Sequence, residues 1–127
     1  MAVTALAITP AGAQTRAGSF GRDGGYSTPE FTAQTSSANA MAMDIRGFSG
    51  GGFYCSGAAT ITFLQGFADA PTTLVQAYDT KDRTAPAAIT VVVGAAGYYD
   101  LPVELWTCEI LGVYASAGVT LRFSFKK

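Results

Sequence analysis

The chain contains no histidine among its 127 residues. Histidine is the commonest general base near neutral pH and the commonest metal ligand, so its absence excludes every catalytic triad that depends on an imidazole. Cysteine is also scarce, because only Cys55 and Cys108 are present. Two cysteines are too few for a disulfide scaffold, a four-cysteine zinc site or an iron–sulfur cluster. We expect two free, packed thiols, with a bridge between them as the alternative.

Charged residues are few as well: 8 basic and 9 acidic residues give a net charge of -1 and make up 13% of the chain, against about 25% in typical soluble domains. Without a basic excess, we expect neither nucleic acid nor a membrane as a partner. No apolar run approaches the ~20 residues of a membrane-spanning helix. The opening MAVTALAITPAGAQ is interpreted as mature protein, because no Lys or Arg precedes Arg16.

The length predicts one globular domain, and 49% hydrophobic residues argue against an unfolded polymer. A folded chain of this length can bury roughly two thirds of the surface that its unfolded form exposes, so no metal or cofactor is needed for stability. The low charge and the 15 glycines predict a subunit whose surface is partly covered by neighbours.

Residues 1–38 differ in composition from the rest, since Ala, Gly, Thr and Ser dominate them. We predict an extended N-terminal arm over 1–38 and a β-sandwich domain over 39–127. The arm carries spaced aromatic residues that are suited to insertion into a neighbouring subunit. The predicted partner-binding residues are Phe20, Arg22, Tyr26 and Phe31. The alternatives are a terminus without a role and an arm folded back onto its own domain.

Short apolar segments with period-two alternation follow the arm, and Gly- and Pro-containing turns separate them. The predicted strands cover residues 39–46, 53–55, 60–66, 72–79, 88–93, 98–101, 105–114 and 119–126. The continuous apolar run 88–93 predicts a strand buried on both faces. In 105–114 the alternation places Trp106, Cys108 and Ile110 inward. Together the segments predict an all-β fold, an antiparallel jelly-roll-like sandwich of seven or eight strands.

The motifs that could carry chemistry are weak. The glycine clusters at 18–25 and 47–52 lack the lysine followed by Ser or Thr that a phosphate loop needs. The segment Asp79–Arg83 mixes both charge signs and predicts a solvated hairpin tip rather than a calcium loop. The remaining carboxylates are dispersed. A pair brought together only by the fold, as in a glycosidase, is the least favoured alternative. We therefore predict that the protein is not an enzyme, with no catalytic residue, metal or cofactor.

Trp106 and the neighbouring Tyr98 and Tyr99 could line a sugar-binding surface, because flat rings stack on pyranose faces. Core packing is the favoured interpretation for Trp106, which shares its predicted face with Cys108 and Ile110. For Tyr99 the two interpretations stay open.

Three segments carry a resemblance to a known group of proteins: residues 44–48, the strand TITFLQG at 60–66, and the closing pair at 113–125. In these segments the chain resembles small β-domains in structural proteins of tailed bacteriophages. The resemblance covers about two thirds of the chain and omits the arm. The turn after the family's TITFQG-like strand differs, because FADAPTT stands here in place of an Asp-Gly turn.

The resemblance implies a virion structural protein, a capsid decoration or cement protein on the capsid surface, made in the host cytoplasm. The implied partners are the major capsid protein or other virion subunits, and a homo-oligomer is expected, with a trimer as one form. The alternative is a carbohydrate-binding or host-attachment module on a phage head, neck or tail appendage.

Overall fold

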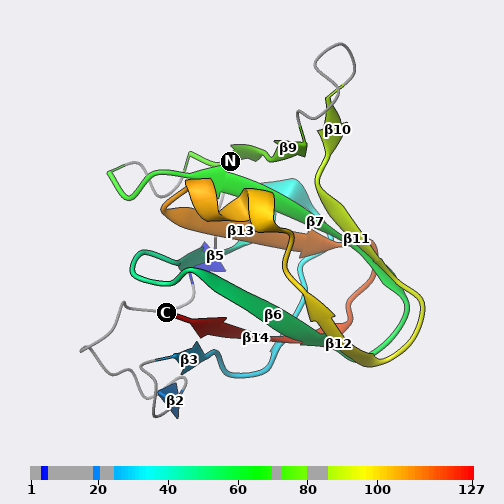
Figure 1. The fold of residues 1–127 in the computed structure, drawn as a ribbon. Coiled ribbons are helices and arrows are strands. Elements are labelled where there is room, and N and C mark those ends of the chain that lie inside the picture. Colours follow the sequence, from blue (N-terminus) through cyan, green and yellow to red (C-terminus); the bar gives the residue numbers. More distant parts are fainter. Residues whose placement is uncertain (1–3, 6–18, 21–24, 70–72, 80–85) are drawn as a thin grey trace.

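A computed structural model describes residues 4–5, 19–20, 25–69, 73–79 and 86–127. These residues form two β-sheets that pack face to face, with two short 3-10 helices and no α-helix (Figure 1). Every strand pair is antiparallel except that of β1 with β5. The predicted antiparallel β-sandwich is therefore confirmed.

Each sheet contains strands from distant parts of the sequence. Sheet A consists, in spatial order, of β1 (Thr4–Ala5), β5 (Met41–Asp44), β13 (Ile110–Ala115), β7 (Ala59–Gly66) and β11 (Thr90–Val93), with β8 (Val75–Gln76) also paired to β7. Sheet B consists of β12 (Gly97–Asp100), β6 (Gly50–Cys55), β14 (Thr120–Lys126), β3 (Tyr26–Ser27) and β2 (Ser19–Phe20), with β4 (Phe31–Thr32) also paired to β14. The remaining elements are the hairpin of β9 (Tyr78–Asp79) with β10 (Ala87–Ala88) and the 3-10 helices η1 (Ser37–Asn39) and η2 (Val103–Thr107).

The strand order is that of a jelly roll. The chain forms nested antiparallel pairs, in which β3 pairs with β14, β5 with β13, β6 with β12 and β7 with β11. Rolling this long ribbon onto itself brings β13 beside β7 in sheet A and β14 beside β6 in sheet B. The predicted jelly-roll-like arrangement follows from these pairings.

The main core lies between the sheets, and β14 shows how the sequence specifies it. Leu121, Phe123 and Phe125 are buried, whereas the residues between them are partly exposed, as period-two alternation requires. The Phe123 ring packs against Phe53 and Phe31, with centroid distances of 5.4 and 6.0 Å. Such stacked aromatic contacts add to the stabilisation that burial of the rings already provides.

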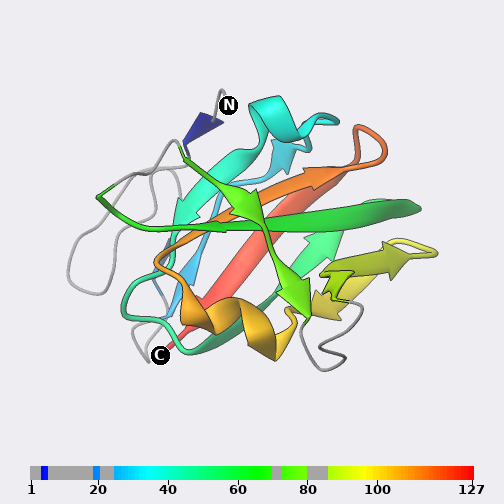
Figure 2. The same cartoon turned by 90° about the horizontal axis from the view of Figure 1, so that it is seen from above.

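A smaller apolar cluster covers the outer face of sheet A. It contains Ala40, Ala42, Leu64, Leu74 and Ile110. Seen from above in Figure 2, the segment with β8 crosses over the strands of sheet A. Leu74 in this segment fills the space above Gly66 and Gly112, where a Cβ would lie 2.7 Å or less from the Leu74 side chain. Sheet A is thus covered on both faces over part of its area.

The described part of the predicted arm belongs to the sandwich. Strands β3 and β4 both pair with β14, and Tyr26 is only 2% exposed. The Thr28 hydroxyl continues the ladder, because it accepts the backbone N–H of Phe123 at 3.0 Å. The insertion of Tyr26 and Phe31 into a neighbour stays a prediction. In this structure both rings pack against the core of their own chain, as in the folded-back alternative.

Two strand predictions also need correction. β11 is the edge strand of sheet A rather than buried on both faces, and Val92 is 75% exposed. Residues 103–107 form η2 rather than the start of a strand; Leu105 is fully buried in the core, and Trp106 is partly buried and packs against it. In β13 the inward residues are Leu111 and Val113. The helix forms because Pro102 fixes its start and because Gln65 donates to the carbonyl oxygen of Leu105 at 3.4 Å.

Candidate functional site

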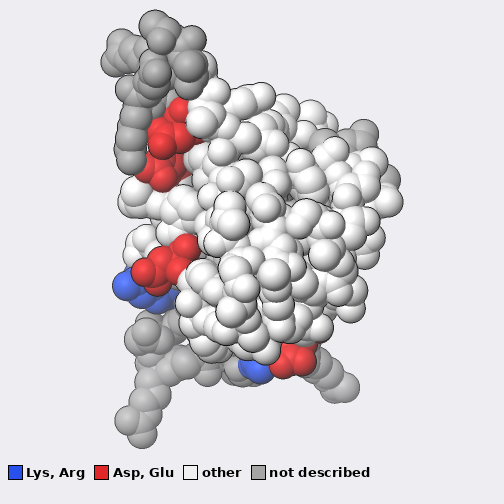
Figure 3. Space-filling model, turned by 90° about the vertical axis from the view of Figure 1, so that its right-hand side faces the viewer, with Lys and Arg blue, Asp and Glu red and all other residues white. Residues whose placement is uncertain are grey.

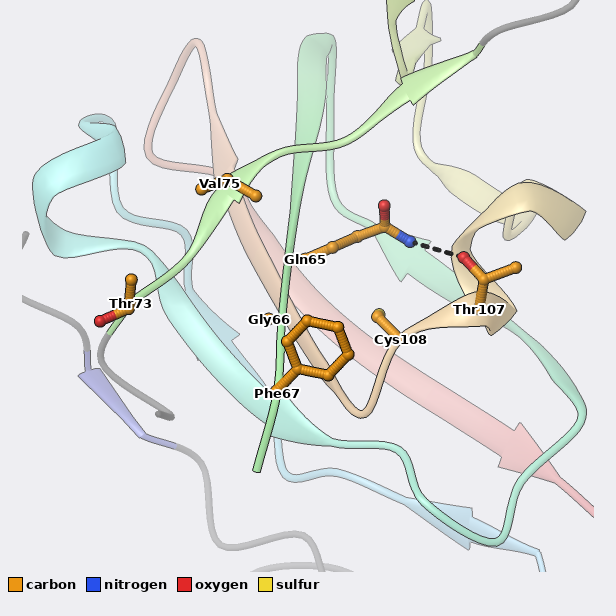
Figure 4. A pocket seen from close by; sticks show the side chains of 7 residues that line it. All are labelled: Gln65, Gly66, Phe67, Thr73, Val75, Thr107 and Cys108. Carbon is orange, nitrogen blue, oxygen red and sulfur yellow. Dashed lines mark hydrogen bonds between the residues drawn. The ribbon is translucent and has the colours of Figure 1, made fainter. Parts of the chain in front are cut away.

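The most enclosed site that we consider is a cavity of about 450 Å³ at the end of β7. Its wall is formed by residues from β7, from the segment of β8, from the end of η2 and from the connection that follows η2 (Figure 4). The lining residues are Gln65, Gly66, Phe67, Thr73, Val75, Thr107 and Cys108. Phe67 and Val75 are 64% and 62% exposed at its rim. An apolar group could enter this cavity and contact both side chains.

Cys108 is the only titratable residue among the described residues that line this cavity, and it limits the chemistry that the cavity can perform. Burial raises the pKa of the Cys108 thiol above its ordinary value, so that the thiol stays protonated at neutral pH and is a poor nucleophile. Its Sγ donates to the carbonyl oxygens of Leu105 and Ile110, each at 3.2 Å. The lining is therefore suited to binding an apolar group and offers no proton-transfer pair.

Both cysteines are free, as predicted. Cys55 lies in the core at the end of β6, whereas Cys108 lies beside the cavity at the opposite end of the sandwich. Among the described residues, no group of three or more Cys, Asp or Glu side chains could hold a metal ion.

A second surface is formed by four connections that meet at one end of the sandwich. The strand registers place the connections β4–β5, β6–β7, β11–β12 and β13–β14 together at this end. Their sequences, AQTSSAN at 33–39, SGA at 56–58, GAA at 94–96 and SAGV at 116–119, contain no charged residue. We call this surface the turn end. Most of its residues are exposed.

Hydrogen bonds hold three of the four connections of the turn end to neighbouring strands. The Ser56 hydroxyl accepts the backbone N–H of Thr120 at 2.8 Å, and the backbone N–H of Ser56 donates to the Thr120 oxygen at 3.0 Å. Ser116 makes the same pair of bonds with Thr60, at 2.8 and 3.0 Å. The connection 33–39 is tied down as well, because Gln34 accepts from the Ala115 N–H at 2.9 Å. A partner would meet a surface that is already ordered.

Charge is distributed unevenly along the strand axis. The connections at the other end carry Arg46, Asp69, Glu104 and Glu109, and Arg46 pairs with Asp44 at 2.6 Å. Figure 3 shows the side on which β11 and the turn-end connections lie, and uncharged residues form nearly all of its centre. Removing an uncharged surface from water costs less free energy than removing a charged one. The cores of protein interfaces are accordingly depleted of charged residues.

The predicted site residues do not form one site. Tyr26 and Phe31 lie in the core region of sheet B. The side chain of Phe20 and the whole of Arg22 lie outside the described residues, and only the backbone pairing of Phe20 with Tyr26 is described. The sequence reasoning missed the turn end, although a signal was present: the predicted connections 56–59, 94–97 and 115–118 all lack charged residues.

The three aromatic residues considered for sugar binding separate in the structure. Trp106 packs edge-on against Phe125 at 6.0 Å, which agrees with the favoured core interpretation. Tyr99 stacks on Phe53 at 5.8 Å, and its hydroxyl donates to the Ala95 oxygen at 2.6 Å. Only Tyr98 is largely free, with 71% of its surface exposed.

No known protein family matches the chain, and neither does any curated protein or solved structure. In the part of the chain that the structure describes, no helix has both the length and the hydropathy to cross a membrane.

Proposed function

We propose that this protein is a virion structural protein, most specifically a capsid decoration or cement protein that binds the assembled shell of a tailed bacteriophage. The observation that carries the proposal is the turn end, a surface whose four connections contain no charged residue and are held by hydrogen bonds, whereas the connections at the other end carry Arg46, Asp69, Glu104 and Glu109. The resemblance of residues 44–48, 60–66 and 113–125 to phage structural proteins supports the same function.

In the proposed mechanism the sandwich body docks onto a shell that is already formed. A protein that binds the assembled state but not the dissociated subunits stabilises the assembly through its binding free energy. A stable contact buries about 800 Å² on each partner, a modest share of the 6590 Å² of accessible surface of this chain. Repetition of this contact over the shell would strengthen the whole particle.

The partner in this proposal is the major capsid protein or another virion subunit, and neighbouring copies of this chain form a homo-oligomer on the capsid surface. Jelly rolls occur in viral capsid and lectin domains. Because one fold hosts many functions, the proposal depends on the turn end and on the resemblance rather than on the fold. The partner contact predicted for Phe20 and Arg22 stays part of the proposal.

The first test is the protein composition of purified particles produced from the genome that encodes this chain. We expect the protein in a copy number comparable with that of the shell protein, measured by quantitative mass spectrometry. Its absence from the particles, or its presence in only a few copies, would contradict a decoration role.

The second test places a charge on the turn end. Ala117→Lys should weaken binding of the purified protein to particles that lack it by about tenfold or more, because the ammonium group must be desolvated in the contact. Ala87→Lys is the matched control, since Ala87 is also an exposed alanine but lies in the β9–β10 hairpin. Co-sedimentation measures both affinities. Equal binding by the two variants would exclude the turn end as the docking surface.

A further inference from the structure

The outer face of sheet B carries an exposed aromatic ring and a partly exposed one beside polar side chains. Tyr98 on β12 lies directly opposite Tyr54 on β6, and their ring centroids are 5.9 Å apart at an interplanar angle of 57°. Arg122 on β14 lies opposite Tyr54 on its other side. All three residues point away from the core, because their sequence neighbours Phe53, Cys55, Leu121 and Phe123 are buried.

A groove of about 260 Å³ runs next to these rings. Its floor is open because Gly52 lies where the neighbouring strands carry Asp100 and Ser124, which pair with Gly52 from either side. The lining residues are Gly51, Gly52, Asp100, Ser124, Phe125 and Lys126. Pockets for drug-sized ligands have volumes of about 300–1,000 Å³, so this groove has room for a group of about one sugar ring.

The polar groups around the groove are available to a ligand. The Asp100 carboxylate and the Arg122 guanidinium make no hydrogen bond or ion pair with any other described residue. The Ser124 hydroxyl is already oriented, because it shares a hydrogen bond of 3.1 Å with the Ser27 hydroxyl. The face thus combines a flat apolar ring, an acceptor and several donors within neighbouring positions of one sheet.

We propose that this face binds a neutral pyranose sugar, as a single ring or as the end of a longer glycan. One face of a pyranose is apolar and can stack on Tyr98, while its hydroxyls both donate to Asp100 and accept from Arg122, Lys126 or Ser124. The carboxylate of Asp100 only accepts hydrogen bonds, so it suits a sugar hydroxyl and not the oxygens of a phosphate or sulfate group. Sugar binding lies on a sheet face separate from the turn end and does not depend on the proposed function.

The full chain is tested against a glycan array and then, by isothermal titration calorimetry, against cellotetraose, maltotetraose, chitotetraose, mannotetraose and a galactose oligomer. We expect at least one neutral glycan to bind, with an affinity that changes little between low and high salt. Dextran sulfate is the anionic probe, and it should not compete.

Matched tyrosine variants locate the binding. Tyr98→Ala should weaken binding of the glycan about tenfold or more, and Tyr98→Phe should keep it, because stacking needs the ring and not the hydroxyl. Asp100→Asn should weaken binding to a similar extent. Tyr78→Ala is the control, since Tyr78 is 53% exposed but lies on β9, outside this face. Because Tyr98 is on the surface, its variants should unfold at nearly the wild-type temperature.

Several results would overturn the proposal. These are no binding of any neutral glycan at millimolar concentration, equal loss in Tyr98→Ala and Tyr78→Ala, and competition by dextran sulfate. Sedimentation of Tyr98→Ala as a smaller species than wild type, with no glycan bound by either, would assign the face to contacts between copies of this chain instead.

Discussion

Replacing Gly51 with alanine tests the packing of sheet B most directly. Gly51 lies in β6, opposite Phe125 of β14. A Cβ added at Gly51 would overlap the backbone oxygen of Ser124 and would lie 3.2 Å from Cδ1 of Phe125. A backbone atom of a paired strand cannot move without disturbing the ladder. The extra methyl group therefore has to separate β6 from β14, the two strands at the centre of sheet B.

The size of the effect follows from overpacking, which costs about 1–3 kcal/mol for one added methyl group in a well-packed site. With a urea dependence of about 1–3 kcal/mol per molar, Gly51→Ala should lower the urea midpoint by roughly 1 M. The control is Gly57→Ala. Around Gly57 no atom lies within 4 Å of an added Cβ, and its φ is not positive. This control should gain about 0.4–1 kcal/mol, because alanine reduces the entropy of the unfolded chain.

Equilibrium unfolding in urea, followed by near- and far-ultraviolet circular dichroism, measures both variants. The same methyl group is added in each case, so helix or strand propensity changes little between them, and the sign of the difference reports the local space. Equal midpoints for Gly51→Ala and Gly57→Ala would refute the tight pairing of β6 with β14.

Three further predictions concern the core, the free thiol and the N-terminal segment. Thr28→Val should lower the free energy of unfolding by about 1–3 kcal/mol, because the Phe123 N–H loses its buried acceptor. Thr28→Ser keeps a hydroxyl acceptor and should keep most of the wild-type stability. Urea unfolding compares the two variants. Burial raises the pKa of Cys108 in the folded state, so the stability of the protein should fall as the pH rises above the ordinary thiol pKa of about 8.5. Thermal unfolding measured from pH 7 to 10 should show a smaller fall in the unfolding temperature for Cys108→Ala than for the wild type. Deletion of residues 1–38 should abolish cooperative unfolding, because β14 loses β3 and β4 together; a folded, cooperative truncation would contradict the pairing.

The parts of the fold that were predictable are those in which a single face is buried. In β14, and in β7 as far as Phe63, apolar residues alternate with polar ones, so period two identifies both the strand and its inner face. The edge strand β11 shows the limit of this reasoning. Its run of valines predicts burial on both faces, but the sequence does not reveal that nothing described covers Val92.

Helix η2 and the arm were mispredicted because distant contacts decide them. Five residues with alternating polarity are compatible with a strand, and the bonds of Gln65 to the η2 carbonyls come from another part of the chain. β3 and β4 are two residues each, too short for a period to be visible. Composition marked this segment as an arm, whereas the free edge of β14 pairs with it.

The jelly roll itself explains how the turn end could arise from short segments of sequence. In a ribbon of nested pairs, successive connections alternate between the two ends of the sandwich, so β6–β7 and β11–β12 meet at one end and β5–β6 and β12–β13 at the other. The first set is built of Gly, Ala and Ser, whereas the second carries Arg46 and Glu104. Solubility alone would favour charge at both ends. An end without charge is what the proposed docking requires, so the composition of these connections supports that proposal.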